Sequence, residues 1–320
     1  MKNKLLNFLR KPRLSIIVIV YDMVSQAKNT LYSLSSDYQT NVSEYDYEVI
    51  VVENKSDNIL GEKTVRGYGT NFKYYLREEK SVSPVNAINF GVQMAKAPLI
   101  AIMVDGARMC SPGVIQYILA AHRITSRAVV AVPGYHLGNE LQQIAVRSGY
   151  NEKVEAGLLN NINWQKNGYR LFEIACFSGT SAGGLFNSLA ESNCFSMSKK
   201  LFEKIGGCDQ RFDLPGGGYI NLDLYRRVCE LPGTTLFMLP GEGTFHQLHG
   251  GVSTSKDYDT LQASLVPQFR QQYFEIRRKQ YTSPSKKPVY LGIIPETAQR
   301  FIQVSSEIIL QRQNNASNKN

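Results

Sequence analysis

Residues 98–113 read PLIAIMVDGARMCSPG, an apolar run that stops on a carboxylate. The unbroken run Leu99–Val104 predicts a central parallel strand covered on both faces, because a half-exposed strand would alternate apolar and polar residues. Asp105 then falls at the carboxyl end of that strand, where open α/β sheets form their ligand crevice. Asp105 and the cation Arg108 are therefore candidates for polar chemistry. The alternative is that Asp105 only shapes the turn before the next helix, as Asp-Gly pairs often do.

Three more segments of the first hundred residues read as strands. Leu14–Val20, Tyr47–Val52 and Phe72–Leu76 are largely apolar or β-branched, and helical spacing of apolar residues follows the first and the third. Strands that alternate with helices predict an α/β fold with a mostly parallel sheet flanked by helices. The polar residues that follow the first two strands, at the same expected edge, are Tyr21, Asp22 and Glu53.

Composition narrows the classes of partner and site. The 320 residues carry a formal net charge of +9, which favours an anionic partner. Charge alone leaves nucleic acid, nucleotide-sugar phosphates and an anionic membrane surface open. Neither Gly-x-Gly-x-x-Gly after the first strand nor Gly-x-x-x-x-Gly-Lys occurs, so dinucleotide and P-loop sites lack their main signature.

Cysteine usage and hydropathy predict the compartment. The five cysteines show no Cys-x-x-Cys spacing, so neither a zinc site nor a disulfide framework is indicated. No apolar run approaches the roughly 20 residues of a membrane span, and the basic lead, residues 1–13, lacks a secretory cleavage pattern. We therefore expect a cytoplasmic protein, with peripheral contact at the inner face of the cell membrane left open.

From about residue 14 to residue 250, the order of these segments resembles the family 2 glycosyltransferases of the GT-A fold. The shared features are Val-Ile-Val-Tyr at the end of the first strand, Ile-Val-Val-Glu-Asn at the end of the second, Ala87-x-Asn89-x-Gly91, and the aspartate after the fourth strand. Further on, GGCDQRF at 206–212 and NLDLYRR at 221–227 resemble the acceptor-side segment of that family.

The resemblance implies a GT-A, Rossmann-like sheet and a reaction. The enzyme would move a sugar from a nucleoside-diphosphate donor, with uridine the expected base, to a saccharide or lipid-linked acceptor in surface polysaccharide synthesis, without a nucleic acid partner. A divalent cation, Mn²⁺ or Mg²⁺, would offset the charge on the departing diphosphate. The residues that the resemblance places on the donor side are Tyr21, Asp22, Glu53, Asn89, Asp105 and Arg108.

One departure from the family pattern concerns the metal. The family normally shows Asp-x-Asp after the fourth strand, whereas this chain has Asp105-Gly106-Ala107. Either other groups hold the metal, or Arg108 supplies the positive charge at the diphosphate. His246 and His249 occur where many relatives place a late histidine, and imidazole ligates divalent ions or donates to phosphate. We expect Asp105, His246 and His249 to form the metal site, although loop histidines are often only hydrogen-bonded.

A further departure concerns the acceptor side. Relatives carry Glu-Asp-x-Asp-Leu with an aspartate as base, and the equivalent pair here is Ile220-Asn221. Asn221 can orient an acceptor hydroxyl but cannot deprotonate it usefully. Asp223 and Asp213 remain as candidate bases for an inverting displacement. Asp223 has arginines at i+3 and i+4, so a helix ion pair is its alternative role.

The sequence also predicts the organisation of the chain. We expect a GT-A domain over 14–255, a helical C-terminal extension over 256–312 and a disordered tail over 313–320. Trp164 is expected in the core, with stacking on an acceptor sugar as the alternative. Two other functions stay open: a GT-A homologue that binds nucleotide or glycan without catalysis, and a nucleotidyltransferase that acts on a sugar phosphate.

Overall fold

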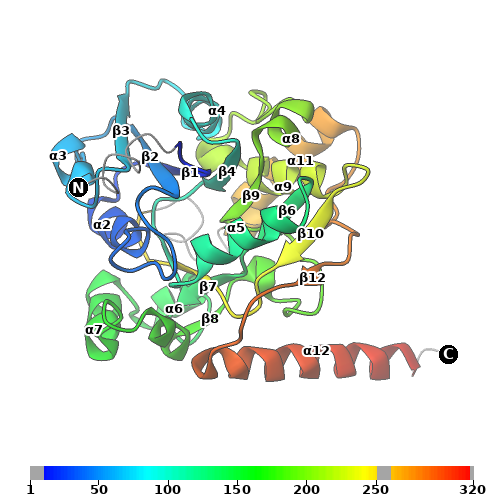
Figure 1. The fold of residues 1–320 in the computed structure, drawn as a ribbon. Helices are drawn as coiled ribbons and strands as arrows, with labels where there is room; N and C mark the ends of the chain where they lie inside the picture. Colours follow the sequence, from blue (N-terminus) through cyan, green and yellow to red (C-terminus); the bar gives the residue numbers. More distant parts are fainter. Residues whose placement is uncertain (1–10, 251–260, 318–320) are drawn as a thin grey trace.

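Four parallel strands form one half of an eight-stranded sheet in the computed structural model, which describes residues 11–250 and 261–317 (Figure 1). Their spatial order is β4-β1-β2-β3, and every pair is parallel. All residues of β1 and β2 are buried, as the unbroken apolar runs predict. The four predicted strands are confirmed, with bounds β1 (Leu14–Val20), β2 (Tyr47–Asn54), β3 (Phe72–Arg77) and β4 (Leu99–Met103).

In the other half of the main sheet, one strand runs antiparallel to both of its neighbours. β9 (Phe195–Ser198) runs antiparallel to both β4 and β6 (Ala128–Ala131). β10 (Thr235–Met238) lies parallel to β6, and β12 (Val289–Tyr290) lies parallel to β10 at the edge. The C-terminal extension, which we expected to be helical, therefore also contributes an edge strand to the main sheet.

A second, smaller sheet lies beyond the carboxyl end of β4. Its order is β5-β11-β7-β8, with bounds β5 (Arg108–Cys110), β11 (Thr244–His246), β7 (Gly134–Leu137) and β8 (Ala175–Phe177). β5 and β11 are antiparallel, and their register sets Arg108 opposite His246. This pairing joins the segment after β4 to a segment more than a hundred residues later.

Helices cover both faces of the main sheet. α4 (Val85–Met94), α8 (Lys199–Lys204) and α9 (Ile220–Cys229) contribute to one apolar cluster, and α2 (Val24–Ser33) and α5 (Val114–Ile124) contribute to the other. The remaining helices are α3 (Glu62–Arg66), α6 (Gln142–Ala145), α7 (Glu152–Ile162), α11 (Val266–Arg277) and α12 (Gln299–Ser317). The short turns are η1 (Val146–Ser148), η2 (Gly168–Ile174), η3 (Gly179–Ser181), η4 (Pro215–Gly217), η5 (Leu261–Leu265) and η6 (Glu296–Ala298).

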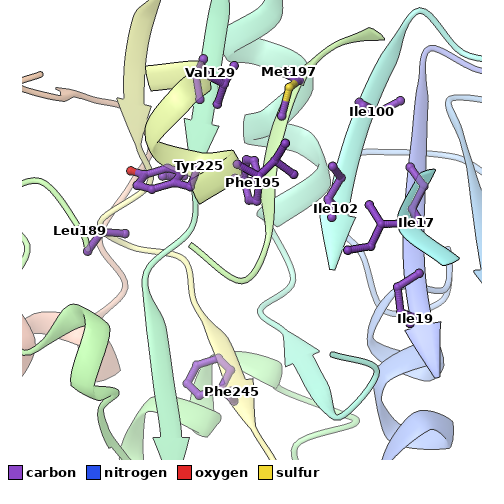
Figure 2. Packing of buried hydrophobic residues seen from close by; sticks show 14 of the residues in the cluster. Ile17, Ile19, Ile100, Ile102, Val129, Leu189, Phe195, Met197, Tyr225 and Phe245 are labelled. Carbon is purple, nitrogen blue, oxygen red and sulfur yellow. The ribbon is translucent and has the colours of Figure 1, made fainter. Parts of the chain in front are cut away.

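Close packing of α4 on the sheet requires the glycine at position 91. A Cβ added to Gly91 would lie 2.5 Å from Cγ2 of Ile17 in β1. The glycine in the Ala-x-Asn-x-Gly pattern therefore serves helix-to-sheet contact. In the same apolar cluster the rings of Phe195 and Tyr225 meet edge to face, with centroids 5.5 Å apart (Figure 2).

Trp164 lies in the core. It is 2% exposed and packs edge to face on Tyr32 and Tyr38, with centroids 5.4 and 5.6 Å away. The prediction that Trp164 belongs to the core is confirmed. The alternative, that it stacks on an acceptor sugar, is wrong. A buried ring between two tyrosines has no face left for a ligand.

The C-terminal part differs from expectation at its end. α12 continues through Ser317, so residues 313–317, which we predicted to be disordered, are helical; the helix runs along one side of the molecule (Figure 1). The expected domain boundary at 255/256 and most of the basic lead fall outside the described residues. Within the described ranges, no helix combines the length and the apolarity that a bilayer crossing requires.

Candidate functional site

Asp105 stands two residues beyond the end of β4, at the edge of the sheet where its ligand crevice is expected. Its Oδ1 accepts a hydrogen bond from the backbone N–H of Ala107 at 2.9 Å, so the carboxylate does shape its own turn. Gly106 is needed in that turn, because a Cβ there would lie 2.7 Å from the carbonyl oxygen of Ile19. The turn leaves the side chain of Asp105 21% exposed. Asp105 therefore shapes its turn and still presents part of its carboxylate at the expected crevice.

Both predicted histidines lie against Asp105. His246 Nε2 is 2.9 Å from Oδ2, and His249 Nε2 is 3.6 Å from Oδ1. The two imidazole centroids are 5.2 Å apart. One ligand atom from each of the three residues lies within 4.8 Å of the other two. The structure therefore brings together the three residues that the sequence assigned to a metal.

Burial and charge act in opposite directions on these groups. Burial would raise the pKa of Asp105, but His249 and His246 outweigh it and hold that pKa well below its ordinary value. Burial, helped by the nearby Arg108 cation, lowers the pKa of His246 to about 4. Burial also lowers the pKa of His249, yet Asp105 outweighs this effect and the net shift is upward. His246 is therefore a neutral imidazole near pH 7, beside a carboxylate.

A glutamine fixes the tautomer of His246. Gln142 Nε2 donates to Glu155 Oε2 and to the carbonyl oxygen of His246, both at 3.0 Å, so its amide oxygen must be the atom facing the imidazole. That oxygen lies 2.6 Å from Nδ1 of His246, which must then carry the proton. Nε2 consequently presents a lone pair toward Asp105. Two lone pairs at 2.9 Å repel unless a proton or a metal ion lies between them, so this donor set can hold a metal ion in place of a shared proton.

Glu155 anchors this arrangement from the first turn of α7. Its carboxylate accepts hydrogen bonds from Gln142, from the hydroxyl of Tyr150 at 2.8 Å and from the backbone N–H of Leu248 at 3.0 Å. Burial raises the pKa of Glu155 to about 7. Gln142 and Glu155 were not among the sequence candidates, because their partners lie about a hundred residues away and no local pattern marks them.

Arg108 lies beside the same carboxylate. It is 9% exposed, and its Nε is 3.5 Å from Asp105 Oδ2. Neither Nε nor Nη1 has a hydrogen-bond partner among the described residues. Burial lowers the pKa of this guanidinium, while Asp105 and Glu191 raise it. A buried cation with unused donors next to Asp105 fits the contact with an anion that the sequence predicted.

The residues predicted to bind the nucleoside differ in how exposed their side chains are. Tyr21 is 58% exposed, and Asp22, at φ 49°, is exposed and accepts from Asn58 Nδ2 at 3.1 Å. Glu53 is fully buried, and its oxygens accept from the backbone N–H groups of Leu60 and Gly61 and from the hydroxyl of Tyr74. Glu53 therefore holds its own loop, which argues against direct contact with a base.

Asn89 also has a closed set of partners. Its Nδ2 donates to the carbonyl oxygen of Cys208 at 2.9 Å, and its Oδ1 accepts from the backbone N–H of Cys208 at 3.0 Å. This reciprocal pair ties α4 to the segment that precedes Asp209. The geometry favours a structural role for Asn89 over the donor contact that we expected.

The residues predicted on the acceptor side differ in how deeply their side chains are buried. Asp223 is 0% exposed and is bound by Arg227 at 2.7 Å and by Arg277 of α11 at 2.6 Å. The helix ion pair predicted at i+4 is present, and this closed geometry argues against a base. Asp213 is exposed and accepts from Gln272 Nε2 at 2.8 Å. Asn221, 6% exposed near the start of α9, donates to Glu191 Oε2 at 3.0 Å.

Three comparisons bear on this geometry. A family described as glycosyl transferase family 2 matches residues 15–193, which is more than half of the chain. Over 113 residues the chain is 32% identical to validoxylamine A glucosyltransferase of Streptomyces hygroscopicus subsp. jinggangensis, covering 35% of this chain and 26% of that protein. A relative of the same name from Streptomyces hygroscopicus subsp. limoneus matches similarly, so the chain spans about a quarter of these curated relatives.

Solved structures share the fold at low sequence identity. The mannosyltransferase PcManGT of Pyrobaculum calidifontis, in complex with GDP-Man and Mn²⁺, aligns with a TM-score of 0.51 at 12% identity, covering 94% of this chain and 70% of that one. Residues 1–349 of S. aureus TarS in complex with UDP align with a TM-score of 0.51 at 11% identity, covering 83% and 73%. These likenesses confirm the predicted fold class, a mostly parallel sheet flanked by helices.

Proposed function

Because the chain belongs to glycosyl transferase family 2, we propose that it transfers a sugar from a nucleoside-diphosphate donor to a saccharide or lipid-linked acceptor. The observation that carries the proposal is the group Asp105, His246 and His249 at the carboxyl end of β4, with Arg108 beside it. This is where a GT-A sheet binds its donor. A uridine-linked sugar is the first donor to test, since relatives of this fold are solved with UDP and with GDP-Man.

A divalent cation fits the site. Asp105 and the lone pairs of His246 and His249 would hold it, and the ion would neutralise charge that develops on the departing diphosphate. Mn²⁺ suits a mixed set of carboxylate and imidazole ligands. Arg108 adds a fixed cation whose unused N–H groups can donate to phosphate oxygens. Together these residues replace the missing second aspartate of the Asp-x-Asp motif.

The reaction itself is proposed as an inverting displacement in surface polysaccharide synthesis. The acceptor oxygen attacks the anomeric carbon from the face opposite the diphosphate, while the bond from that carbon to the phosphate oxygen breaks. Groups on the Arg108 side of the cleft stabilise the leaving phosphate. In this proposal Asn221, near the start of α9, orients the groups that meet the acceptor hydroxyl.

Calorimetric titration tests the donor site. UDP and GDP are titrated into the wild type, Asp105→Ala and His246→Ala, each with Mn²⁺, with Mg²⁺ or with a chelator. We expect one diphosphate to bind only with metal, and both substitutions to weaken it by at least about tenfold. Glu62→Gln is the control, because Glu62 is exposed and its ion-pair partner among the described residues is Arg66. Absence of nucleotide binding by the wild type under every condition would overturn the proposal.

A turnover measurement distinguishes the proposed enzyme from a homologue that binds nucleotide without catalysis. It predicts the same metal-dependent diphosphate binding but no release of diphosphate from UDP-glucose, UDP-GlcNAc or GDP-mannose. The observation that favours it is the amide of Asn221 where relatives place a carboxylate. Measuring hydrolysis of these three sugar nucleotides by the wild type therefore decides between the two functions.

A further inference from the structure

We propose that Glu191 is the general base of this enzyme and that it takes over the role left empty by the amide of Asn221. The proposal rests on the proposed glycosyl transfer and names the group that activates the acceptor. Glu191 lies in the segment between η3 and β9, and it was not among the residues that the sequence suggested.

A closed network of side chains places the Glu191 carboxylate at the start of α9. Oε2 accepts from Asn221 Nδ2 at 3.0 Å, and Oε1 accepts from Asn193 Nδ2 at 3.2 Å. Asn221 Nδ2 also faces the carbonyl oxygen of Ser192 at 3.2 Å and Asn193 Oδ1 at 3.3 Å. Because all three of these neighbours are acceptors, the amide nitrogen of Asn221 must face them. Asn221, at the position where the family resemblance places an aspartate, thus donates a hydrogen bond to the carboxylate of Glu191 from another segment.

Burial distinguishes the groups that position this carboxylate from the carboxylate itself. Asn193 and Asn221 are each 6% exposed, and Ser192 is fully buried. Ser192 is fixed by hydrogen bonds between its hydroxyl and the carbonyl oxygens of Val132 and Cys194. Glu191 remains partly exposed. Buried, well-fixed neighbours therefore hold a carboxylate that stays partly accessible. A general base must be accessible in this way to meet an incoming hydroxyl.

Arg108 connects Glu191 with the donor group. Its guanidinium is close enough to both Asp105 and Glu191 for each to raise its pKa. Glu191 and Asp105 therefore both lie near the same buried guanidinium. The start of a ten-residue helix adds a favourable field for the ionised carboxylate.

The other acids on the acceptor side are less suited to this step. Asp223 is closed off between Arg227 and Arg277, and Asp209 is bound by Arg211 and Arg277. Asp213 is exposed and hydrogen-bonded to Gln272, without a contact that links it to Arg108 or Asp105 among the described residues. Among these acids, Glu191 is the one held by neutral amides and close enough to Arg108 to influence its charge.

The step balances as follows. An oxygen of Glu191 takes the proton of the acceptor O–H, and that O–H electron pair becomes the new bond to the anomeric carbon. The bond between the anomeric carbon and the phosphate oxygen breaks, and its electron pair leaves with the nucleoside diphosphate. Glu191 later releases the proton to water. Asn221 keeps the carboxylate aimed at the acceptor and takes no proton.

Hydrolysis of a sugar nucleotide tests the assignment without an identified acceptor, because water then takes the acceptor's place. The substrate is whichever of UDP-glucose, UDP-GlcNAc and GDP-mannose the wild type hydrolyses fastest. Glu191→Gln should lower kcat about 100-fold or more, the usual contribution of a general base, with an unchanged Kd for UDP or GDP in Mn²⁺. The acid limb of the pH profile of kcat/KM should disappear. Glu191→Asp should retain that limb at lower kcat.

A relocation experiment sharpens the test. Asn221→Asp in the Glu191→Gln background returns a carboxylate to the family's usual position, and we expect it to recover at least tenfold of the lost kcat. A kcat for Glu191→Gln within about threefold of the wild type overturns the base assignment. So does loss of diphosphate binding in that variant, which would place Glu191 on the donor side. Failure of the wild type to bind either diphosphate overturns the proposed function first, and the base assignment falls with it.

Discussion

Asp105 and Asp223 are both carboxylates held between two nitrogen-bearing side chains, and they differ in what those partners permit. Asp105 lies between two imidazoles, with its side chain 21% exposed. Asp223 lies between two guanidiniums, with its side chain 0% exposed. A neutral imidazole presents a lone pair that a metal ion can use, whereas a guanidinium never gives up its proton. Asp105 can therefore bind a metal ion in place of its present contacts, whereas Asp223 stays in its ion pairs.

The largest effect expected from this difference is on activity. Asp105→Asn keeps the shape of the side chain but removes the charge that a cation needs. Because a metal ion contributes several kcal/mol of charge stabilisation, sugar-nucleotide hydrolysis should fall roughly 1000-fold. The free energy of unfolding should fall by less than in Asp223→Asn, since the side chain of Asp105 is partly exposed and lies beside one guanidinium, Arg108, instead of two. Steady-state kinetics and urea unfolding measure the two quantities. Retained Mn²⁺-dependent turnover would break the contrast with Asp223.

Asp223→Asn should give the reverse pattern. Two arginines would lose the carboxylate that neutralises them, and uncompensated buried charge costs about 3–5 kcal/mol of unfolding free energy. The fraction that remains folded should bind diphosphate like the wild type. Urea unfolding followed by fluorescence of Trp164 measures the loss, with Glu62→Gln as the exposed ion-pair control. Unchanged stability together with lost activity would instead assign Asp223 to the reaction.

The support of His246 should produce a smaller effect. Gln142→Ala removes the acceptor that fixes the imidazole tautomer, so the Kd for Mn²⁺ should rise about 10–100-fold. Saturating Mn²⁺ should restore most of kcat, because Gln142 touches no substrate in the proposed site. Gln143→Ala is a matched control one residue away, since the side-chain oxygen of Gln143 has no partner among the described residues. Equal effects of the two substitutions would remove Gln142 from the metal site.

The contrast between the two aspartates also shows what the sequence can predict. The strand runs marked the four parallel strands to within two residues; burial on both faces selects apolar runs directly in β1, β2 and β4, whereas β3 is only partly buried. The fourth strand placed Asp105, and the family's segment order pointed to His246 and His249. Arginines at i+3 and i+4 signalled the ion pair of Asp223, of which the structure shows the Arg227 contact.

The missed features share a physical cause. Gln142, Glu155 and Glu191 make hydrogen bonds to residues 30 to 104 positions away in the chain, which no local spacing reports. Glu53 and Asn89 stand in family positions, yet their hydrogen-bonding capacity is taken up by a loop and by a backbone pair. The edge strand β12 has two residues, Val289 and Tyr290, which is too short a run to mark a strand in the sequence. The family motifs thus predicted where these side chains lie better than they predicted what the side chains do.

The smallest effect concerns Asp209, which shares Arg277 with Asp223 but is more exposed. Hydrogen bonding to Arg211 and the charge of Arg277 hold the pKa of Asp209 below its ordinary value. A carboxylate whose folded-state pKa is depressed stabilises the fold above its unfolded pKa of about 4, and loses this contribution as pH falls through the folded-state pKa. Asp209→Asn should therefore lower the free energy of unfolding by at most ~1 kcal/mol at pH 7, and the difference from the wild type should shrink toward pH 2. Urea titrations at pH 7, 4 and 2.5 measure it. A loss as large as that of Asp223→Asn would show that the shared arginine, and not burial, sets the cost of removing either carboxylate.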